Sequence, residues 1–479
     1  MRHQASPFVL LAAAVFAPLA CSLAVSSELD GKPTASDLNT DAGTADAPGD
    51  SLDEQADQVS PDADYDADAT EGGDVGAACE ACPESCCDGV CADLKNDPSN
   101  CGECGSACLA GRDCSHGKCA NGFVTVSEVG APEARLHACA VWTGSEMFVW
   151  GGITPEGLLL NSGAAYDPAT DTWRDVSLNG APAPREEPTC VPMGDKVFVW
   201  GGADWTQNVL LGDGAIWDPS ADSWLSLPDS DGPAPRIRAT ALWTGNAVLL
   251  WGGQDGVTAN AHQEGSGALY DPDSQLWRVM STDNAPAHAK AQAWAWTGAA
   301  LYVFGGRDDG GNNVYNDLHT YSPIADTWIP IVGLTPPAVR SNAFATWTGT
   351  RFLIWGGQDV TGVGLMDGAS FDPTTQTWSL LSPEAPPAGR ALEMFHSGWS
   401  QWLGDDWLIA GGSDINGVQP DIVRYDPAAA PDKAWSGAVP WVPQYLHEWG
   451  VGVWTGEEFI VWGGSDGSNP VVGGSRWMP

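Results

Sequence analysis

A pair of adjacent glycines recurs seven times along this 479-residue chain, and this repeat constrains the fold more than any other feature. Each pair follows a run of apolar and aromatic residues, as in VFVWGGADW at 197–205. Successive pairs are 50 to 55 residues apart, and they lie at 151–152, 201–202, 252–253, 305–306, 356–357, 411–412 and 463–464. A period of this length with β-rich units is typical of propeller blades. Glycine suits positions where backbones crowd together or adopt positive φ angles.

Two further turn signals divide each repeat into four strands. A Trp-Thr-Gly turn precedes the strand that ends in the glycine pair, and it begins at Trp142, Trp243, Trp296, Trp347 and Trp454. An Asp-Pro turn follows the third strand, as in YDPATDTW at 166–173, because proline presets a turn angle and aspartate accepts hydrogen bonds from nearby amides. The tryptophan that closes this motif begins a fourth strand. We therefore expect an all-β chain.

The seventh repeat lacks a fourth strand of its own. Six fourth strands are marked by Trp173, Trp224, Trp277, Trp328, Trp378 and Trp435, and the chain stops at GGSRWMP, residues 473–479. However, FVTVSEVGAPEAR at 123–135 aligns without a gap with WRDVSLNGAPAPR at 173–185, and Phe123 takes the place of the tryptophan. We expect this N-terminal strand to pair with the strand around Trp477 and to complete the last blade, which leaves no open edge in the ring.

These motifs resemble kelch repeats over residues 123–479. The resemblance implies a seven-bladed kelch-type β-propeller. Galactose oxidase is similar in fold and uses tyrosine and histidine ligands around copper, but here the eight histidines are scattered and no adjacent Tyr-His pair occurs. No serine-histidine-acid set, phosphate loop or HExxH motif stands out. The sequence thus indicates no catalytic residue, no cofactor and no metal site.

Recognition is expected on one face of the propeller. In a four-stranded blade, the second turn and the crossover to the next blade share a face, and the first and third turns share the other. The first and third turns are short and stereotyped, whereas the second turns vary from GGSDGSNPVVGG to GGQDGVTANAHQEGSGALYDP. Variable loops on a regular scaffold commonly carry binding.

The crossovers carry a repeated basic residue at Arg135, Arg185, Arg236, Arg340 and Arg390, with His447 in the seventh repeat. The fourth repeat has Ala289 there, flanked by His288 and Lys290. Two interpretations are open. The arginines could hold a carboxylate or sulfate of a glycan. Alternatively, they form a repeated structural ion pair with the aspartates that follow the glycine pairs, Asp204, Asp255, Asp308, Asp359, Asp414 and Asp466.

Most of the 25 tryptophans recur in register, which indicates core positions. Four break the pattern and are candidates for an exposed aromatic contact, namely Trp205, Trp399, Trp402 and Trp441.

Ten cysteines crowd into residues 79–119, at Cys79, Cys82, Cys86, Cys87, Cys91, Cys101, Cys104, Cys108, Cys114 and Cys119. In an exported protein this density indicates disulfides, because so small a segment has little core. Zinc or an iron–sulfur cluster is the rival, since Cys101 and Cys104 have metal-type spacing. The segment resembles the cysteine module of stigma-specific proteins. In the propeller, Cys139 and Cys190 occupy nearly the same place in consecutive repeats, and either a bridge or two buried thiols would fit.

The N-terminal region predicts export. Residues 1–21 resemble a bacterial lipoprotein signal in which Cys21 becomes the lipidated first residue, although Pro18 departs from that motif. Residues 22–78 are expected to form a disordered acidic linker, because 22–74 hold fifteen acidic side chains and one lysine. The stretch DADYDADAT at 62–70 places aspartates at alternate positions, as some calcium loops do, but it lacks the glycine and terminal glutamate of an EF-hand, which favours a solvated spacer. The expected plan is thus signal 1–21, linker 22–78, disulfide module 79–119 and propeller 123–479.

Composition narrows the classes of molecule that this chain could bind. The net charge of −42 argues against nucleic acid, which needs a clustered basic surface. The favoured hypothesis is a monomeric, surface-displayed or secreted binding protein for a protein or glycan, held by a lipid anchor at an outer membrane or cell surface. The alternative is an extracytoplasmic enzyme that acts on acidic sugars, such as a kelch-type sialic acid epimerase.

Overall fold

The computed structural model describes residues 123–479 apart from 229, 255–264, 309–312, 334, 385, 393–397, 415–416, 419–420, 441–449, 466–470 and 478–479. Before residue 123 it describes 85–87, 90–92, 99–100, 104, 114–115 and 118–119. The chain divides into a smaller unit, Ser27–Ala120, and a larger one that contains Asn121–Pro479. Within the described residues, no helix has the length and apolar character needed to cross a membrane.

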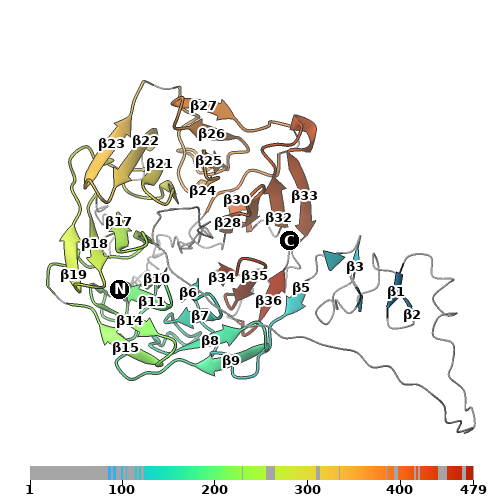
Figure 1. The fold of residues 1–479 in the computed structure, drawn as a ribbon. Coiled ribbons are helices and arrows are strands. Elements are labelled where there is room, and N and C mark those ends of the chain that lie inside the picture. Colours follow the sequence, from blue (N-terminus) through green and yellow to red (C-terminus); the bar gives the residue numbers. More distant parts are fainter. Residues whose placement is uncertain are drawn as a thin grey trace, which may run out of the picture. The chain divides into compact units, whose positions relative to one another are not determined.

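Seven four-stranded antiparallel sheets form a ring in the larger unit (Figure 1). Blade 1 contains β6 (Cys139–Trp142), β7 (Met147–Trp150), β8 (Gly163–Asp167) and β9 (Thr172–Asp175). Blade 2 contains β10 (Thr189–Met193), β11 (Lys196–Trp200), β14 (Gly214–Asp218) and β15 (Ser223–Ser226). Blade 3 contains β16 (Thr240–Trp243), β17 (Val248–Trp251), β18 (Gly267–Asp271) and β19 (Leu276–Val279).

The other four blades continue the ring. Blade 4 contains β20 (Ala293–Trp296), β21 (Leu301–Arg307), β22 (Val314–Ser322) and β23 (Thr327–Ile331). Blade 5 contains β24 (Phe344–Trp347), β25 (Phe352–Trp355), β26 (Gly368–Asp372) and β27 (Thr377–Leu380). Blade 6 contains β28 (Gly398–Trp402), β29 (Trp407–Gly411), β32 (Asp421–Tyr425) and β33 (Trp435–Pro440). Blade 7 contains β34 (Val451–Trp454), β35 (Phe459–Trp462), β36 (Gly474–Trp477) and β5 (Phe123–Thr125).

The predicted closure of the ring is confirmed. Strand β5 pairs antiparallel with β36, and Phe123 lies opposite Trp477. In blade 1 the same position joins Trp173 to Tyr166, so the phenyl ring replaces an indole in the register the alignment predicted. The first and last strands of the propeller thus share one sheet, and neither is left as an open end.

Apolar side chains fill each junction between neighbouring blades, in seven clusters among the described residues. Successive residues of a strand point to opposite faces. Phe148 therefore packs toward blade 2, and its neighbour Val149 packs toward blade 7. Because both faces of each blade are covered, the second strands are continuous apolar runs, such as MFVW at 147–150, instead of alternating ones.

The fourth-strand tryptophans join adjacent blades at the outer rim. The indole N–H of Trp173 donates to the Ser127 carbonyl at 2.8 Å, and Trp224 donates to the Ser177 carbonyl at 2.7 Å. Each of these serines follows the outer strand of the preceding blade. These indoles are structural, which explains why the sequence repeats tryptophan at this position.

The glycine pairs are required by backbone contact. Gly151 and Gly152 have φ of 73° and 95°. A Cβ on Gly152 would lie 2.4 Å from the Leu136 carbonyl oxygen, and one on Gly151 would lie 3.1 Å from the Arg185 carbonyl oxygen of the next blade. The N–H of Gly152 donates to that Arg185 oxygen at 2.8 Å. Both predicted causes, close approach and positive φ, are confirmed here.

The smaller unit contains two short hairpins in its described residues, β1 (Ser85–Cys87) with β2 (Val90–Ala92) and β3 (Cys114–Ser115) with β4 (Lys118–Cys119). Cys87 and Cys104 form a disulfide, with Cα atoms 5.3 Å apart. This bridge confirms the disulfide interpretation for that pair and removes Cys104 from the proposed metal spacing with Cys101. The predicted signal, with its lipidation residue Cys21, and the linker 22–78 lie outside the described residues.

Candidate functional site

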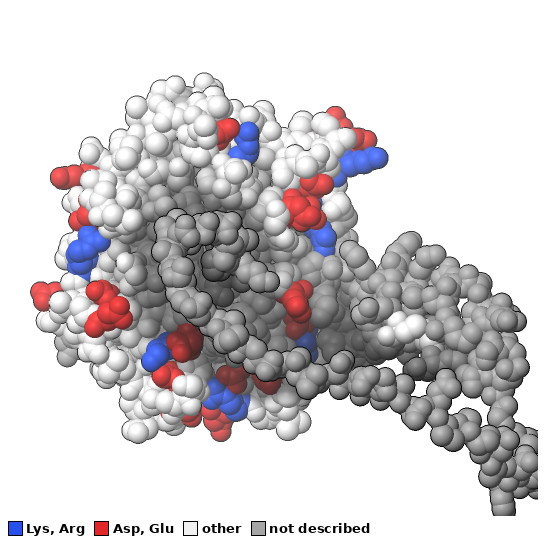
Figure 2. Space-filling model, in the orientation of Figure 1, with Lys and Arg blue, Asp and Glu red and all other residues white. Residues whose placement is uncertain are grey.

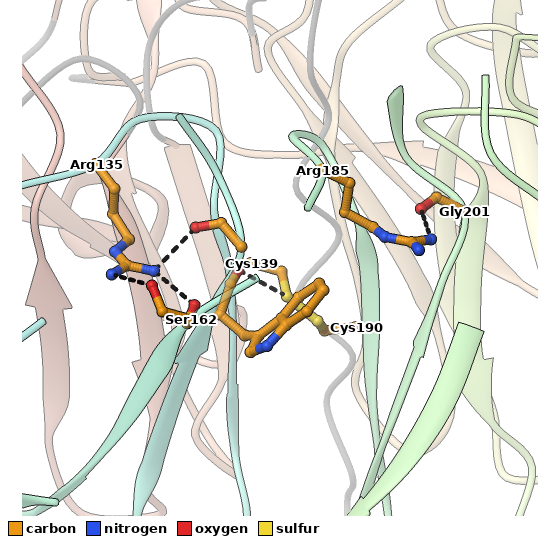
Figure 3. The surroundings of a disulfide bond; sticks show 8 residues. Arg135, Cys139, Ser162, Arg185, Cys190 and Gly201 are labelled. Atoms are coloured by element: carbon orange, nitrogen blue, oxygen red, sulfur yellow. Dashed lines mark hydrogen bonds between the residues drawn. A yellow bond between two sulfur atoms is a disulfide. The ribbon is translucent and has the colours of Figure 1, made fainter. Parts of the chain in front are cut away.

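Five crossover arginines lie buried beneath the second turns. In blade 2, one terminal nitrogen of Arg185, Nη1, donates to the carbonyls of Gly201 and Asp213, each at 3.0 Å, and Nε donates to the Ala183 carbonyl at 2.8 Å. Figure 3 shows Arg185 directed at Gly201 and Arg135 directed at Ser162. We call this arrangement the arginine clasp. It ties the glycine pair and the start of the third strand to the crossover of the same blade.

The other four arginines repeat the clasp. Each donates to the carbonyl of the first glycine of its own blade, and these arginines are Arg135, Arg236, Arg340 and Arg390. All five are 0 to 3% exposed. Burial lowers the pKa of Arg135 to about 10, an effect that nearby Glu133 opposes. The guanidinium groups are engaged inside the blades, so they are not presented to a glycan or any other ligand.

The prediction that these arginines pair with the aspartates after the glycine pairs was wrong for Asp204 and Asp359, and Asp255 and Asp466 lie outside the described residues. Arg185 pairs with Asp213 at 2.8 Å and Arg340 pairs with Asp367 at 3.0 Å, and both aspartates stand directly before the third strand. Asp204 instead accepts from Thr206 and Gln207 in its own turn. Asp204 and Asp359 thus accept hydrogen bonds within their own second turns and do not reach the arginine.

Blade 4 has no arginine at this position and uses a histidine. The Nε2 atom of His288 lies 2.8 Å from Oδ1 of Asp317, and its ring stacks on Tyr315 with centroids 3.6 Å apart. His319 Nδ1 lies 3.3 Å from the other carboxylate oxygen of Asp317. Burial alone would raise the pKa of Asp317, but the His288 hydrogen bond and charge lower it overall. The His288–Asp317 pair thus forms a partly buried polar contact at the crossover of blade 4, one residue before the arginine position that Ala289 occupies.

Cys139 and Cys190 form a disulfide between blades 1 and 2, with Cα atoms 5.9 Å apart (Figure 3). The pairing registers explain how they meet. Cys139 lies opposite Trp150, the residue before the glycine pair, whereas Cys190 lies opposite Val199, one residue earlier than Trp200. Because side chains alternate between faces, this offset turns Cys190 back toward blade 1. Of the two possibilities left open by the sequence, the bridge is the one observed.

A polar network surrounds the inner strand starts of blades 1 to 3. The Nδ1 atom of His137 lies 2.7 Å from Glu186, and Arg238 donates to Glu187 at 2.9 Å. Burial raises the pKa of Glu187, and Arg238 opposes this shift. His137, Glu187 and Arg238 also adopt positive φ angles of 57°, 56° and 62°. Since these groups pair with one another across blades, the network fixes the inner strands.

The second turns differ from this buried layer and from the first turns. The first turns share one closure, in which the residue before the turn glycine donates its N–H three residues ahead, as Thr143 does to Glu146 at 3.0 Å and Thr348 to Arg351 at 3.0 Å. The second turns of blades 2 and 6 fold into extra hairpins, β12 (Ala203–Asp204) with β13 (Val209–Leu210) and β30 (Ser413–Asp414) with β31 (Gly417–Val418). The second turns therefore vary between blades in conformation as well as in sequence.

Exposed apolar side chains gather in the described parts of the second turns. Six large ones are 40 to 64% exposed, namely Leu158, Val209, Val360, Val363, Met366 and Val472. The described first turns, which include 143–146, 244–247 and 348–351, contribute no residue to the exposed large apolar set. Sequence reasoning identified this face by its variability but missed these residues. The signal was present, since a Leu, Val or Met in a glycine-rich turn has no strand face to occupy.

The four tryptophan candidates have four different outcomes. Trp399 is 6% exposed and packs on Phe459, so its prediction as an exposed contact was wrong. Trp402 pairs with Trp407 across the first turn, as Trp142 pairs with Met147, so WLG is a variant of the Trp-Thr-Gly turn and Trp402 is in register. Trp205 is half-buried in the β12–β13 turn. Trp441 and His447 lie outside the described residues.

No group of three or more His, Cys, Asp or Glu side chains in the described part of the chain has a metal-binding arrangement. The candidate site is a surface of exposed apolar side chains in the second turns, above a layer of buried arginines that are bonded to their own blades.

Comparison with known proteins gives the family. The model of the KLHDC2/KLHL20/DRC7 Kelch-repeats domain matches residues 124–260 and 238–440, and the chain belongs to the kelch-repeat proteins. The stigma-specific STIG1-like family model matches residues 61–122. Kelch propellers generally mediate protein interactions, so the family indicates a protein partner in general terms.

Individual relatives are similar over part of their length. The chain is 26% identical to the kelch-like protein terF of Aspergillus terreus over 317 residues, which are 64% of this chain and 66% of that protein. It is 26% identical to acyl-CoA-binding domain-containing protein 4 of Arabidopsis thaliana, over 43% of this chain and 31% of that protein. It is 24% identical to N-acetylneuraminate epimerase of Shigella sonnei, over 43% of this chain and 65% of that protein. The chain thus spans from about a third to about two thirds of the length of these relatives.

Proposed function

We propose that this chain is an exported interaction protein whose propeller binds a protein partner through the second-turn face. The observation that carries the proposal is the difference between the second turns and the first turns. Six exposed large apolar side chains lie in the second turns, above a layer of buried and fully engaged arginines. Exposed apolar residues rimmed by polar ones are typical of protein-binding surfaces.

The finer parts of this proposal concern the N-terminal region. We propose that the chain is lipidated at Cys21 and displayed at an outer membrane or cell surface, or else secreted, with residues 22–78 as an acidic leash and 79–119 as a disulfide module. The interblade bridge Cys139–Cys190 and the bridge Cys87–Cys104 support an oxidising location. A glycan partner remains part of the proposal through Trp205, the half-buried aromatic of the second turns.

The alternative, an enzyme that acts on acidic sugars, has less support. It draws on the partial similarity to N-acetylneuraminate epimerase. However, the five arginines that would hold the acidic group are buried and bonded to their own blades. Assays of glycan binding and of sialic acid epimerisation by the purified chain test this alternative directly, and activity in both would favour it.

Site-directed photo-cross-linking in the producing cells tests the proposed binding face. A photoreactive residue replaces Leu158 or Val363 in the second turns, and a matched control replaces Thr350, an exposed residue of a first turn. We expect both second-turn positions to give the same discrete protein product and the first-turn position to give none. Equal products from all three positions, or no product from correctly folded chains, would contradict the proposal.

A further inference from the structure

The charge on the second-turn face points to the chemistry of the partner. Resting on the proposed function, we propose that this face binds a protein segment in which basic side chains are interspersed with apolar ones. The occupant is therefore a cationic, partly apolar polypeptide. An acidic protein, a nucleic acid or an acidic glycan would be repelled by the same surface.

Carboxylates surround this face. Eight exposed ones lie in the described second turns and crossovers, from the crossover into blade 1 to the crossover into blade 6, at Glu128, Glu133, Glu156, Asp213, Asp231, Asp283, Asp367 and Glu384. Three of these, Glu133, Asp213 and Asp367, lie beside clasp arginines. The other five have no ion-pair partner among the described residues.

Basic side chains in the described part of the same face are buried or half-buried. The five clasp arginines are buried, and Arg238 is 10% exposed against Glu187. Lys290 and Arg307 are half-buried, and Arg307 donates to the Ser341 hydroxyl at 2.7 Å. The surface that a partner meets there is consequently acidic.

The opposite face shows a different arrangement. Its basic side chains pair with neighbouring carboxylates at the first and third turns, as Arg174 does with Glu146 at 2.6 Å and Lys196 with Asp218 at 2.8 Å. Arg351 with Asp372 and Arg476 with Glu458 follow the same pattern. Figure 2 shows basic and acidic side chains next to one another around the periphery of the ring. These ion pairs neutralise part of the charge on this face, which keeps exposed carboxylates of its own at Asp195, Asp273, Asp405 and Glu457. The second-turn face differs because its arginines are buried in the clasps and because exposed apolar side chains lie among its carboxylates.

The apolar side chains lie among these carboxylates. In blade 1, Leu158 is two residues from Glu156, and in blade 5 Met366 is adjacent to Asp367. A segment that presents only positive charge would leave the apolar side chains in water. A segment with both kinds of side chain buries apolar area and gains charge complementarity, which raises the association rate and suppresses wrong partners.

Peptide binding to the full chain tests this chemistry. Three probes of equal length are used: a leucine–lysine peptide, a leucine–glutamate peptide and a serine–lysine peptide. One variant neutralises second-turn-face carboxylates, Glu156→Gln, Asp231→Asn, Asp283→Asn and Glu384→Gln. The matched control neutralises four exposed carboxylates of the other face, Asp195→Asn, Asp273→Asn, Asp405→Asn and Glu457→Gln. Both variants change the net charge equally, and both retain the acidic residues 22–74.

We expect the leucine–lysine peptide to bind most tightly and to lose about fivefold or more in affinity with the first variant, against less than about twofold with the control. Binding should weaken as salt rises. Equal losses in both variants, or a serine–lysine peptide that binds as tightly as the leucine–lysine peptide, would overturn the inference. If cross-linking is specific to the second-turn face but the peptides bind without the expected selectivity, the proposed function stands and only the proposed chemistry of the partner is refuted. If cross-linking also shows no preference for this face, the proposed function is refuted as well.

Discussion

Two layers on the same face of the propeller, the arginine clasps and the second turns above them, differ in how sequence relates to role. The clasp repeats with one side chain, one set of carbonyl acceptors and nearly complete burial in five blades. The second turns differ in sequence, and those of blades 2 and 6 fold into hairpins whereas those of blades 1 and 5 share another closure. They expose Leu, Val and Met. Repetition in a propeller thus indicates a requirement of every blade, whereas binding is expected where the repeat breaks down.

The buried layer should hold most of the stability, and the interblade disulfide is its strongest single element. Replacing both cysteines, Cys139→Ala with Cys190→Ala, removes a bridge that closes a sequence separation of 51 residues. We expect the free energy of unfolding to fall by about 4 kcal/mol, measured by denaturant unfolding under oxidising conditions. Under reducing conditions the variant and the parent chain should converge. An unchanged midpoint in oxidising buffer would show that this bridge does not stabilise the ring.

Removal of one clasp should have the next largest effect. Arg340→Ala leaves the carbonyls of Gly356 and Asp367 without their buried donor. We expect a loss of about 3 kcal/mol, because buried acceptors without a donor are costly. Arg340→Lys is the control, since it keeps the charge but not the planar fork, and should recover only part of the loss. Full recovery by lysine would mean that charge alone, and not the forked geometry, is required.

The third turns, on the opposite face, should respond to acid. Asp271 accepts from the Ser274 hydroxyl at 2.8 Å and the Asp273 N–H at 2.9 Å, and these bonds lower its pKa. A folded-state pKa below the unfolded value stabilises the protein above about pH 4, and this contribution is lost as the pH falls further. Asp271→Asn should therefore destabilise the chain slightly at pH 7, and the gap in unfolding midpoint should close near pH 2. A gap that widens in acid would reverse the assigned sign.

Substitutions in the second turns should have the smallest effect on stability. Val360→Ser, Val363→Ser and Met366→Ser change side chains that are 53, 47 and 53% exposed. Each should alter the free energy of unfolding by no more than about 0.5 kcal/mol, as is usual for surface positions. Together they should reduce the cross-linking yield from Leu158, because they remove apolar contact area elsewhere on the same face. A large loss of stability would place these residues in the structural layer instead.

The sequence predicted the repeated strands and turns of the blades, but it was less informative about which side chains contact one another. The period, the four-strand blade and the closure by Phe123 followed from register alone, and the structure agrees. The partner of Arg185 could not be predicted from register, because the path of the second turn brings Asp213 to the arginine. The spacing between this aspartate position and the glycine pair is not fixed.

Small offsets in strand register were the second limit on what the sequence could predict. A single residue of register decides whether Cys190 faces blade 1 or blade 3, because Cys139 lies twelve residues before its glycine pair and Cys190 lies eleven residues before its own. Trp402 was taken as irregular because Leu403 replaces the turn threonine, although its pairing is that of the other blades. Exposure of Leu158 or Met366 depends on turn conformations that the seven blades do not have in common.

A paired measurement in blade 5 tests the separation of the two layers most directly. The unfolding midpoint and the cross-linking yield from Leu158 are determined for Arg340→Ala and for the combined Val360→Ser, Val363→Ser and Met366→Ser variant. The account predicts that the first lowers the midpoint while folded protein still cross-links, and that the second keeps the midpoint and loses the product. The opposite pattern, in which the arginine variant stays stable but fails to cross-link, would contradict it.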